Sequence, residues 1–387
     1  MTTYSAVRTT GIYCRPGCGA KPLAENVQTF ELVAAAEAAG FRACLRCRPY
    51  RVAGTVADEA PELVCRAIQL IITGVLDDAD ETALAARLGL SARHLRRMFN
   101  DHLGVTPDQF ARSRRAHFAR RLLDDSDLTI ADIAFASGFG SLRQFNRAMR
   151  EVFRSTPREL RDRRRRTDRM VADGGLVLRM PFTPPYDWEA MIDFLAGHAI
   201  PGVESVADGI YRRAIALDGD PGLLEIGPGG ADHLLLRAHL PYWEGVIHVF
   251  ERATQLVGLP LIKARPGIRV PGAWGPFETA VQAVVRDLAP TEADEILGQL
   301  VKSTGTPVAG LGHGLTHAFP SAETLAAQYD GPGRVGETLQ ALAKEVAAGN
   351  VRLDGAESLE TLVSALIRID GVSETAARHV ASRLTYL

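Results

Sequence analysis

Four of the five cysteines lie close together near the N-terminus, in two pairs. Three residues separate Cys14 from Cys18, and two separate Cys44 from Cys47. In a reducing compartment, such pairs are typical ligands of a tetrahedral zinc site rather than disulfides. We therefore expect one Zn²⁺ held by these four thiolates; disulfides or unligated surface thiols are the alternative. Cys65 lies apart in the amphipathic stretch ELVCRAIQLII, where a small buried apolar side chain is expected.

A bound metal would also explain how residues 1–55 fold as a domain. A segment of about 50 residues buries too little apolar surface to be stable alone, and a metal can supply the missing free energy. Four arginines flank the cysteines and are predicted to contact DNA phosphates: Arg15, Arg42, Arg46 and Arg48. A solvated basic rim is the other interpretation.

Composition and length indicate an ordinary multidomain protein. The 387 residues correspond to two to four domains, and 46% hydrophobic with 23% charged residues excludes a disordered or fibrous chain. No apolar run is long enough to span a membrane, and the N-terminus lacks the apolar core of a secretory signal. We expect a cytoplasmic protein with no membrane partner.

The net charge of −2 conceals two halves of opposite sign. Residues 1–169 contain 28 Lys and Arg against 20 Asp and Glu, a net charge of +8, whereas residues 170–387 contain 16 against 26, a net charge of −10. Only Lys21 among the 28 cations is a lysine. Arginine suits phosphates and base edges, so the first half favours a nucleic-acid partner, although a high-GC genome would also enrich arginine.

Two segments share the pattern of a helix, a glycine turn and a capped second helix. In TALAARLGLSARHLRRMF, Gly89 makes the turn and Ser91 caps; in TIADIAFASGFGSLRQF, Gly138 and Ser141 take these places. The helical stretch DQFARSRRAHFARRLL joins them. Residues 60–162 are therefore predicted to form an all-α domain with two helix-turn-helix units; a generic three-helix bundle is the alternative.

The second helix of each unit would enter the major groove of DNA. The residues predicted to face DNA are Ala92, Arg93 and Arg96 in the first unit, and Arg143, Gln144 and Arg147 in the second. Arginine can pair with guanine and glutamine with adenine, although any of them could instead contact a phosphate. The basic run that follows predicts a flexible linker over residues 163–174.

From residue 175 the sequence alternates between strand and helix patterns. LVLRMPF, IYRRAIALD, LLEIGP and HLLLRAHL are typical of strands and WEAMIDFLAGHAI of a helix, which predicts a small antiparallel α+β domain over 175–240. Helical stretches then dominate residues 241–387. The expected fold class is multidomain α+β: a four-cysteine zinc domain, an all-α double helix-turn-helix domain, a small antiparallel α+β domain and a helical domain.

The residues around the cysteines resemble the N-terminal domain of the Ada alkylation-response proteins. RTTGIYCRPGC, ENVQTF and AAGFRACLRCRP carry the resemblance, which covers about residues 4–50. It implies that Cys14 is the acceptor, whose zinc-bound thiolate irreversibly takes a methyl group from a DNA methylphosphotriester, once per molecule. Methylation would change the formal charge of the cluster from −2 to −1 and so raise the affinity for DNA.

Two further resemblances cover the rest of the chain. LSARHLRRMF and IADIAFASGFGSLRQFNRAMREVFRSTPRELR resemble the DNA-binding domain of the AraC family, over residues 62–162. LVLRMPFTPPYDW, AIPGVESVADGIYRRAI, RPGIRVPGAWGPFETAVQAV and LIRIDGVSETAARHV resemble the AlkA-type 3-methyladenine DNA glycosylases, over residues 175–387. The last resemblance implies a helix-hairpin-helix fold for the helical domain.

The hairpin of this helical domain departs from the glycosylase pattern L-P-G-[VI]-G-x-W-T-A. At 369–377 the chain has IDGVSETAA, and Asp370 and Glu374 would repel a phosphate held at the helix N-terminus. The catalytic aspartate of such enzymes lies about one helix beyond the hairpin, and the sequence ends at Leu387 before that position. We therefore expect a degenerate glycosylase domain, shortened at its C-terminal end.

Taken together, these patterns predict a sensor of DNA alkylation damage that activates transcription. Cys14 would accept the methyl group, the helix-turn-helix units would bind promoter DNA and engage RNA polymerase, and Zn²⁺ would be the cofactor of this nucleoid-associated protein. The alternative is a bifunctional regulator and active 3-methyladenine glycosylase. A third hypothesis is a zinc-stabilised AraC-type regulator that senses a small ligand without methyl transfer.

Overall fold

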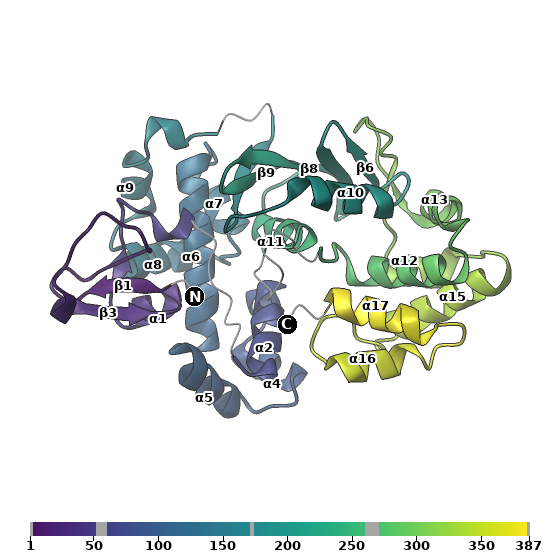
Figure 1. The fold of residues 1–387 in the computed structure, drawn as a ribbon, viewed down its shortest axis with the longest axis horizontal. Helices are drawn as coiled ribbons and strands as arrows, with labels where there is room; N and C mark the ends of the chain where they lie inside the picture. Colours follow the sequence, from purple (N-terminus) through teal and green to yellow (C-terminus); the bar gives the residue numbers. More distant parts are fainter. Residues whose placement is uncertain (1–2, 52–59, 171–173, 260–270, 385–387) are drawn as a thin grey trace.

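The computed structural model describes residues 3–51, 60–170, 174–259 and 271–384. The expected boundary at residue 55, part of the expected linker and the first residues of the RPGIRVPGAWG motif lie outside these ranges. Within them, no helix is both long and apolar enough to cross a membrane. The elements confirm a multidomain α+β fold (Figure 1).

The N-terminal domain is a small four-stranded sheet in the order β3-β1-β2-β4. Its elements are β1 (Tyr4–Val7), β2 (Ile12–Cys14), β3 (Val27–Phe30), α1 (Val33–Ala38) and β4 (Arg42–Ala43). Strand β1 pairs antiparallel with β2 and β3, whereas β4 runs parallel to β2. This parallel pairing brings the residues after β4 beside the end of β2.

The next domain is entirely helical and contains both predicted helix-turn-helix units. Its helices are α2 (Glu62–Ile72), α3 (Val75–Asp78), α4 (Glu81–Arg87), α5 (Ala92–Leu103), α6 (Pro107–Asp125), α7 (Ile130–Ala136), α8 (Leu142–Phe153) and α9 (Pro157–Asp162). Gly89 and Gly138 make the turns in the left-handed region, with φ of 69° and 77°. The hydroxyls of Ser91 and Ser141 accept the backbone N–H of the third residue of α5 and α8, as the sequence predicts.

A five-stranded antiparallel sheet, in the order β5-β9-β8-β7-β6, opens the C-terminal half. Its elements are β5 (Leu176–Pro181), α10 (Trp188–His198), β6 (Glu204–Ala207), β7 (Ile210–Leu217), β8 (Asp220–Gly230), β9 (His233–His239) and α11 (Val246–Leu256). Then follow α12 (Pro276–Leu288), α13 (Ala293–Thr304), the short strands β10 (Thr306–Pro307) and β11 (His317–Ala318), α14 (Ala322–Gln328), α15 (Gly333–Ala347), α16 (Leu359–Leu366) and α17 (Glu374–Leu384).

The zinc domain and the five-stranded sheet share one hydrophobic core with the second helix-turn-helix unit. Tyr13 of β2, Ala116 of α6, Phe153 of α8 and Leu178 of β5 all belong to it. Phe250 of α11 joins the same core. Helix α6 stands between the zinc domain and the sheet (Figure 1). The helical domain has its own core, and the first helix-turn-helix unit has a third.

The prediction of a flexible linker over residues 163–174 is wrong for its described part. Arg164 donates hydrogen bonds to the Ser126 carbonyl and to Asp127, both at 2.9 Å. The Met170 N–H donates to the Asp125 carbonyl at 2.8 Å, and Asp168 is buried. The segment is held because its basic side chains meet acidic groups at the end of α6, a proximity that the linear sequence does not reveal.

Candidate zinc and DNA-binding sites

The four cysteines predicted as ligands converge on one point. Cys14 ends β2, and the Cys44 N–H donates to the carbonyl of Tyr13 at 2.9 Å, which places the second pair beside the first. Turns close each pair: the Cys18 N–H donates to the Arg15 carbonyl at 3.3 Å. The four sulfur atoms all lie within 4.8 Å of one another.

The donor set fits a divalent cation that prefers sulfur. Burial and the neighbouring thiols raise the pKa of Cys14, and burial with the nearby Cys44 raises the pKa of Cys47 to about 12. Burial acts in the same direction on Cys44, but backbone N–H groups of Cys47 and Arg46 outweigh it and lower its pKa. Thiols this close ionise together only beside a cation. Tetrahedral zinc with bonds of about 2.3 Å places its sulfurs about 3.8 Å apart, which this cluster accommodates.

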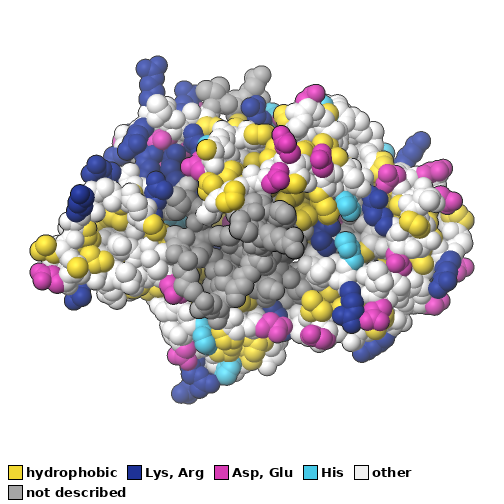
Figure 2. Space-filling model, in the orientation of Figure 1, with side chains coloured by type: hydrophobic (Ala, Val, Ile, Leu, Met, Phe, Trp, Pro, Cys, Tyr) yellow, Lys and Arg dark blue, Asp and Glu magenta, His cyan; other side chains and the backbone are white. Residues whose placement is uncertain are grey.

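Three of the four flanking arginines lie where a DNA backbone could reach them. Arg15 and Arg46 are exposed and Arg42 is half-buried. The Nε of Arg15 donates to the Cys47 carbonyl at 3.0 Å, so this guanidinium is held across the cluster. In Figure 2, Lys and Arg side chains gather at the upper left, over the zinc domain and α9.

Arg48 is not a surface contact, which corrects the expectation that it meets a phosphate. Its φ of 50° turns the side chain inward directly after Cys47, and only 6% of the residue is exposed. Its Nη1 donates a hydrogen bond to Asp168 and lies 3.6 Å from Asp124. The sequence shows that Arg48 follows a predicted zinc ligand, but it does not show that Asp124 and Asp168 lie close enough to pair with it.

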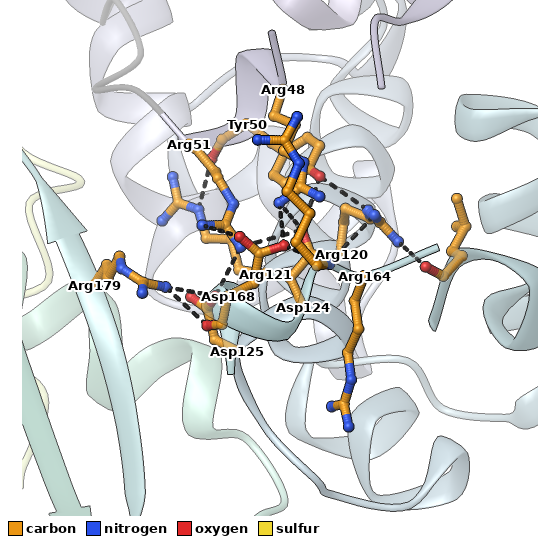
Figure 3. A network of polar contacts seen from close by, with 12 residues as sticks. Arg48, Tyr50, Arg51, Arg120, Arg121, Asp124, Asp125, Arg164, Asp168 and Arg179 are labelled. Atoms are coloured by element: carbon orange, nitrogen blue, oxygen red, sulfur yellow. Dashed lines mark hydrogen bonds and ion pairs between the residues drawn. The ribbon is translucent and has the colours of Figure 1, made fainter. Parts of the chain in front are cut away.

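Arg48 belongs to a buried polar network that joins three domains (Figure 3). Tyr50 donates to Asp124 of α6 at 2.8 Å, and Arg51 pairs with Asp125 at the same distance. The members are Arg48, Tyr50 and Arg51 at the end of the zinc domain, Arg120, Asp124 and Asp125 of α6, Asp168, and Arg179 of β5. Arg179 donates to Asp125 at 2.7 Å and so connects the five-stranded sheet. The network fixes the zinc domain relative to both neighbours.

The residues predicted to read DNA lie on the two capped helices, as expected. Arg93 of α5 and Arg143 and Gln144 of α8 are exposed, while Ala92 is half-buried at the start of α5. Arg96 and Arg147 are exposed as well, but each forms an ion pair with a glutamate: Arg96 with Glu81 and Arg147 with Glu151. Neither glutamate was among the residues predicted from the sequence. Glu81 lies on another helix, α4, whereas Glu151 follows Arg147 by four residues, a spacing that favours a pair on one helix face.

Comparison with known proteins identifies related domains in three regions of the chain. Three family descriptions match: the metal binding domain of Ada at residues 2–50, a helix-turn-helix domain at 84–163 and the AlkA N-terminal domain at 177–259. A Mycobacterium tuberculosis protein described as a probable bifunctional transcriptional activator/DNA repair enzyme AlkA is 35% identical over 98% of this chain and 82% of its own length. The chain belongs to this family of bifunctional activators and repair enzymes.

Two shorter matches each cover part of the chain. The Escherichia coli bifunctional transcriptional activator/DNA repair enzyme Ada is 33% identical over 40% of this chain and 43% of its own length. The E. coli DNA-3-methyladenine glycosylase 2 is 36% identical over 27% of this chain and 42% of its own length. The Ada-type domain makes Zn²⁺ the cofactor, and the helix-turn-helix units make DNA a partner of the chain.

The AlkA-type domain is docked on the helix-turn-helix domain through α11. His248 of α11 contacts Asp77 of α3, which also receives a hydrogen bond from Arg115 of α6. The rings of Phe118 and Phe250 lie 5.3 Å apart between α6 and α11. No signal in the sequence pointed to this interface, because its residues are spread over three distant segments.

The hairpin of the AlkA-type helical domain forms between α16 and α17, with Gly371 in the left-handed region. The Ser373 hydroxyl accepts the Ala376 N–H at 3.1 Å at the start of α17, and Glu374 pairs with Arg378 at 2.7 Å. Asp370 is exposed next to this helix start. Two carboxylates therefore lie where the resemblance would place a DNA phosphate.

Proposed function

We propose that this protein is a sensor of DNA alkylation whose Cys14 accepts a methyl group from a DNA methylphosphotriester, and that the methylated form activates repair genes. The observation that carries the proposal is the convergence of four cysteine sulfurs within 4.8 Å, in a domain matched by the metal binding domain of Ada. Cys14 ends a strand and its sulfur belongs to the cluster, so the nucleophile is fixed before DNA arrives.

The reaction needs no separate base. Zn²⁺ held by the four cysteines would keep their thiolates ionised at neutral pH. The Cys14 Sγ attacks the methyl carbon of the triester, an S–C bond forms, the C–O bond breaks, and its electron pair leaves with the phosphodiester anion. No proton moves in this step. The thioether on Cys14 has no leaving group that restores the thiolate, so each molecule reacts once.

Basic residues around the cluster would bring the modified backbone to Cys14. Arg15 and Arg46 are exposed beside the ligands and can pair with the charged phosphates on either side of the neutral triester. Arg42 is half-buried and completes this rim. Because Arg48 is committed to Asp168, we leave it out of the proposed phosphate contacts.

Methylation would act as an electrostatic switch. Loss of one thiolate lowers the negative charge of the cluster by one, which weakens repulsion of DNA phosphates and raises affinity for the promoter. Helices α5 and α8 would then read the site through Ala92, Arg93, Arg96, Arg143, Gln144 and Arg147. The bound protein would act on the nucleoid and recruit RNA polymerase.

The test is the transfer of methyl from duplex DNA that carries methylphosphotriesters. Intact-protein mass spectrometry should show one added methyl group per chain, and peptide mapping should place it on Cys14. Cys14→Ser should take up none, while Cys65→Ser, which changes a buried cysteine outside the cluster, should react like the wild type. Uptake by Cys14→Ser, or transfer to another residue, would contradict the proposal.

A second candidate function is base excision, which the match to the AlkA N-terminal domain favours. Excess protein should be incubated with alkylated duplex DNA while binding is measured in parallel. We expect free 3-methyladenine only at the uncatalysed rate, because Asp370 and Glu374 occupy the hairpin that should hold a phosphate. Release above that rate would instead assign both activities to the chain.

A further inference from the structure

Two of the arginines predicted to contact DNA bases, Arg96 and Arg147, are held in the same way. The Nε of Arg96 on α5 contacts Oε2 of Glu81, and the Nε of Arg147 on α8 donates to Oε1 of Glu151 at 2.7 Å. Both arginine side chains are exposed, at 59% and 76%. In each case the contact is made by Nε, the inner nitrogen of the guanidinium.

The two glutamates are themselves fixed to one place, the first turns of α6. Glu81 is nearly buried, and its second oxygen accepts the Asp108 N–H at 3.1 Å. The second oxygen of Glu151 accepts Nη1 of Arg112 at 3.2 Å, and Arg112 also pairs with the Asp108 carboxylate. Each carboxylate therefore has one oxygen for an arginine of a reading helix and one for an anchor on α6.

Electrostatics support a charged Glu151 within this arrangement. Burial acts to raise its pKa, but the hydrogen bonds and charges of Arg147 and Arg112 outweigh it and hold the pKa below the ordinary value. An anchored, ionised carboxylate restricts the rotamers of a long side chain that would otherwise be free. Restricting it before binding reduces the entropy lost when the side chain meets its target.

A guanidinium held at Nε can present its two Nη groups end-on. That fork matches the two acceptors, O6 and N7, that guanine offers in the major groove. We propose that Glu81 and Glu151 are positioning residues that orient Arg96 and Arg147 toward guanines. Asp108 and Arg112 of α6 would fix the orientation of the two guanidinium groups relative to each other. This inference rests on the proposed function of α5 and α8 as the reading helices.

A different role for the glutamates makes an opposite prediction. If they only repelled phosphates, their neutralisation would raise the affinity for every DNA sequence by the same factor. If they position the arginines, neutralisation lowers the preference for the correct sequence, whatever happens to the affinity for other DNA. The ratio of the two dissociation constants separates the two roles.

The experiment uses the full, zinc-loaded chain and a library of random duplexes. Selection with the wild type defines a consensus, and dissociation constants are then measured for the consensus and for duplexes in which each guanine is replaced. Glu151→Gln should reduce discrimination at one guanine about fivefold or more, and Glu81→Gln should do so at another, the range of a lost bidentate contact. Glu62→Gln, which breaks an exposed pair with Arg66 on α2, is the matched control and should keep the wild-type ratio.

Each outcome of this experiment supports or contradicts the positioning role of the two glutamates. Equal changes for consensus and substituted duplexes would overturn the positioning role and leave only repulsion. If the nearly buried Glu81 variant fails to fold, Glu151→Gln and Arg112→Met still test the proposal, since Arg112 contacts Glu151 but no reading arginine. If the wild type selects no consensus, the proposed function of α5 and α8 is wrong. If the wild type selects a consensus and the glutamate variants discriminate it equally well, only the positioning role is wrong.

Discussion

Arg48, the residue directly after the zinc ligand Cys47, is joined by a buried ion pair to Asp168, 120 residues further along the chain. Asp168 lies beyond the second helix-turn-helix unit, so this pair connects the first and last parts of the DNA-binding half. Arg179 extends the connection to the five-stranded sheet through Asp125. The geometry around the cysteine cluster thus depends on residues from three domains.

Arg48→Met should destabilise the protein although it leaves the zinc ligands intact. The change leaves the buried carboxylates of Asp124 and Asp168 with less positive charge around them. Loss of one partner of a buried ion pair lowers the free energy of unfolding by roughly 3 kcal/mol. Chemical unfolding followed by far-UV circular dichroism measures this. Arg46→Met, an exposed neighbour with the same change of side chain, should unfold like the wild type. Equal stability of both variants would show that the pair contributes nothing.

Removal of zinc should destabilise the helix-turn-helix domain as well as the domain that binds the metal. Tyr13 lies in the same hydrophobic core as Phe153 of α8, and its hydroxyl donates to Glu37 at 2.7 Å beside His117 of α6. Chelation should therefore lower the midpoint of thermal unfolding of the helices, and Cys44→Ser should do the same with less than one zinc per chain. Unchanged helix unfolding after complete loss of the metal would contradict this coupling.

Local patterns predicted more of the elements than of the contacts between them. The two capped turns at Ser91 and Ser141 and the four cysteine ligands depend on residues close in sequence or on a recognisable spacing, and the structure confirms the capped turns and brings the cysteines together. The inward turn of Arg48 depends on Asp168 and on Asp124 of α6, and the anchored basic segment depends on Asp127 just after α6; each partner is more than 35 residues away in the sequence. Such pairings arise only when helices pack, so neither periodicity nor composition reveals them.

Acid should weaken the contact between the helix-turn-helix domain and the AlkA-type domain through Asp77. Burial acts to raise the pKa of Asp77, but His248 and Arg115 outweigh it and lower the pKa. A carboxyl with a lowered folded pKa stabilises the fold above its unfolded pKa, about 3.9, and this contribution is lost as the pH falls through the folded value.

Asp77→Asn should therefore lower the stability at pH 6, and its difference from the wild type should shrink below about pH 4, where the wild type loses the same charge. Thermal unfolding across this pH range is the measurement. Asp78→Asn changes the same charge at an exposed neighbour and should follow the wild type throughout. A constant difference at all pH values would indicate that packing, not charge, is what the asparagine alters.

Arg46 and Arg143 should affect DNA binding in different ways. Arg46→Ala should weaken binding to all sequences and reduce the salt dependence by about one phosphate contact, since it would meet the backbone. Arg143→Ala should mainly reduce the preference for the selected sequence over substituted ones. Titrations at several salt concentrations, with both variants on the same duplexes, distinguish the two patterns. The assignment fails if Arg46→Ala changes sequence preference.

The hairpin between α16 and α17 should bind DNA better when its acidic groups are neutralised. Asp370→Asn combined with Glu374→Gln removes two negative charges beside a helix N-terminus, which itself favours an anion. We expect tighter binding to duplexes of unrelated sequence at low salt. The control is Glu360→Gln with Glu357→Gln, which removes two charges ahead of α16 and in its first turn. The same gain from the control pair would mean that net charge alone is responsible.

The shared core of the zinc domain and the second helix-turn-helix unit has a consequence for how one molecule can use its two DNA-binding surfaces. A sensor on a loose tether could hold a damaged phosphate and a promoter at once over many separations. Here the buried network keeps Cys14 at one fixed displacement from α8. If Cys14 acts as proposed, one molecule would search for damage and bind a promoter in succession, unless a damaged phosphate lies at that one displacement. The number of activated promoters would then report how many molecules have already met damage, one lesion for each.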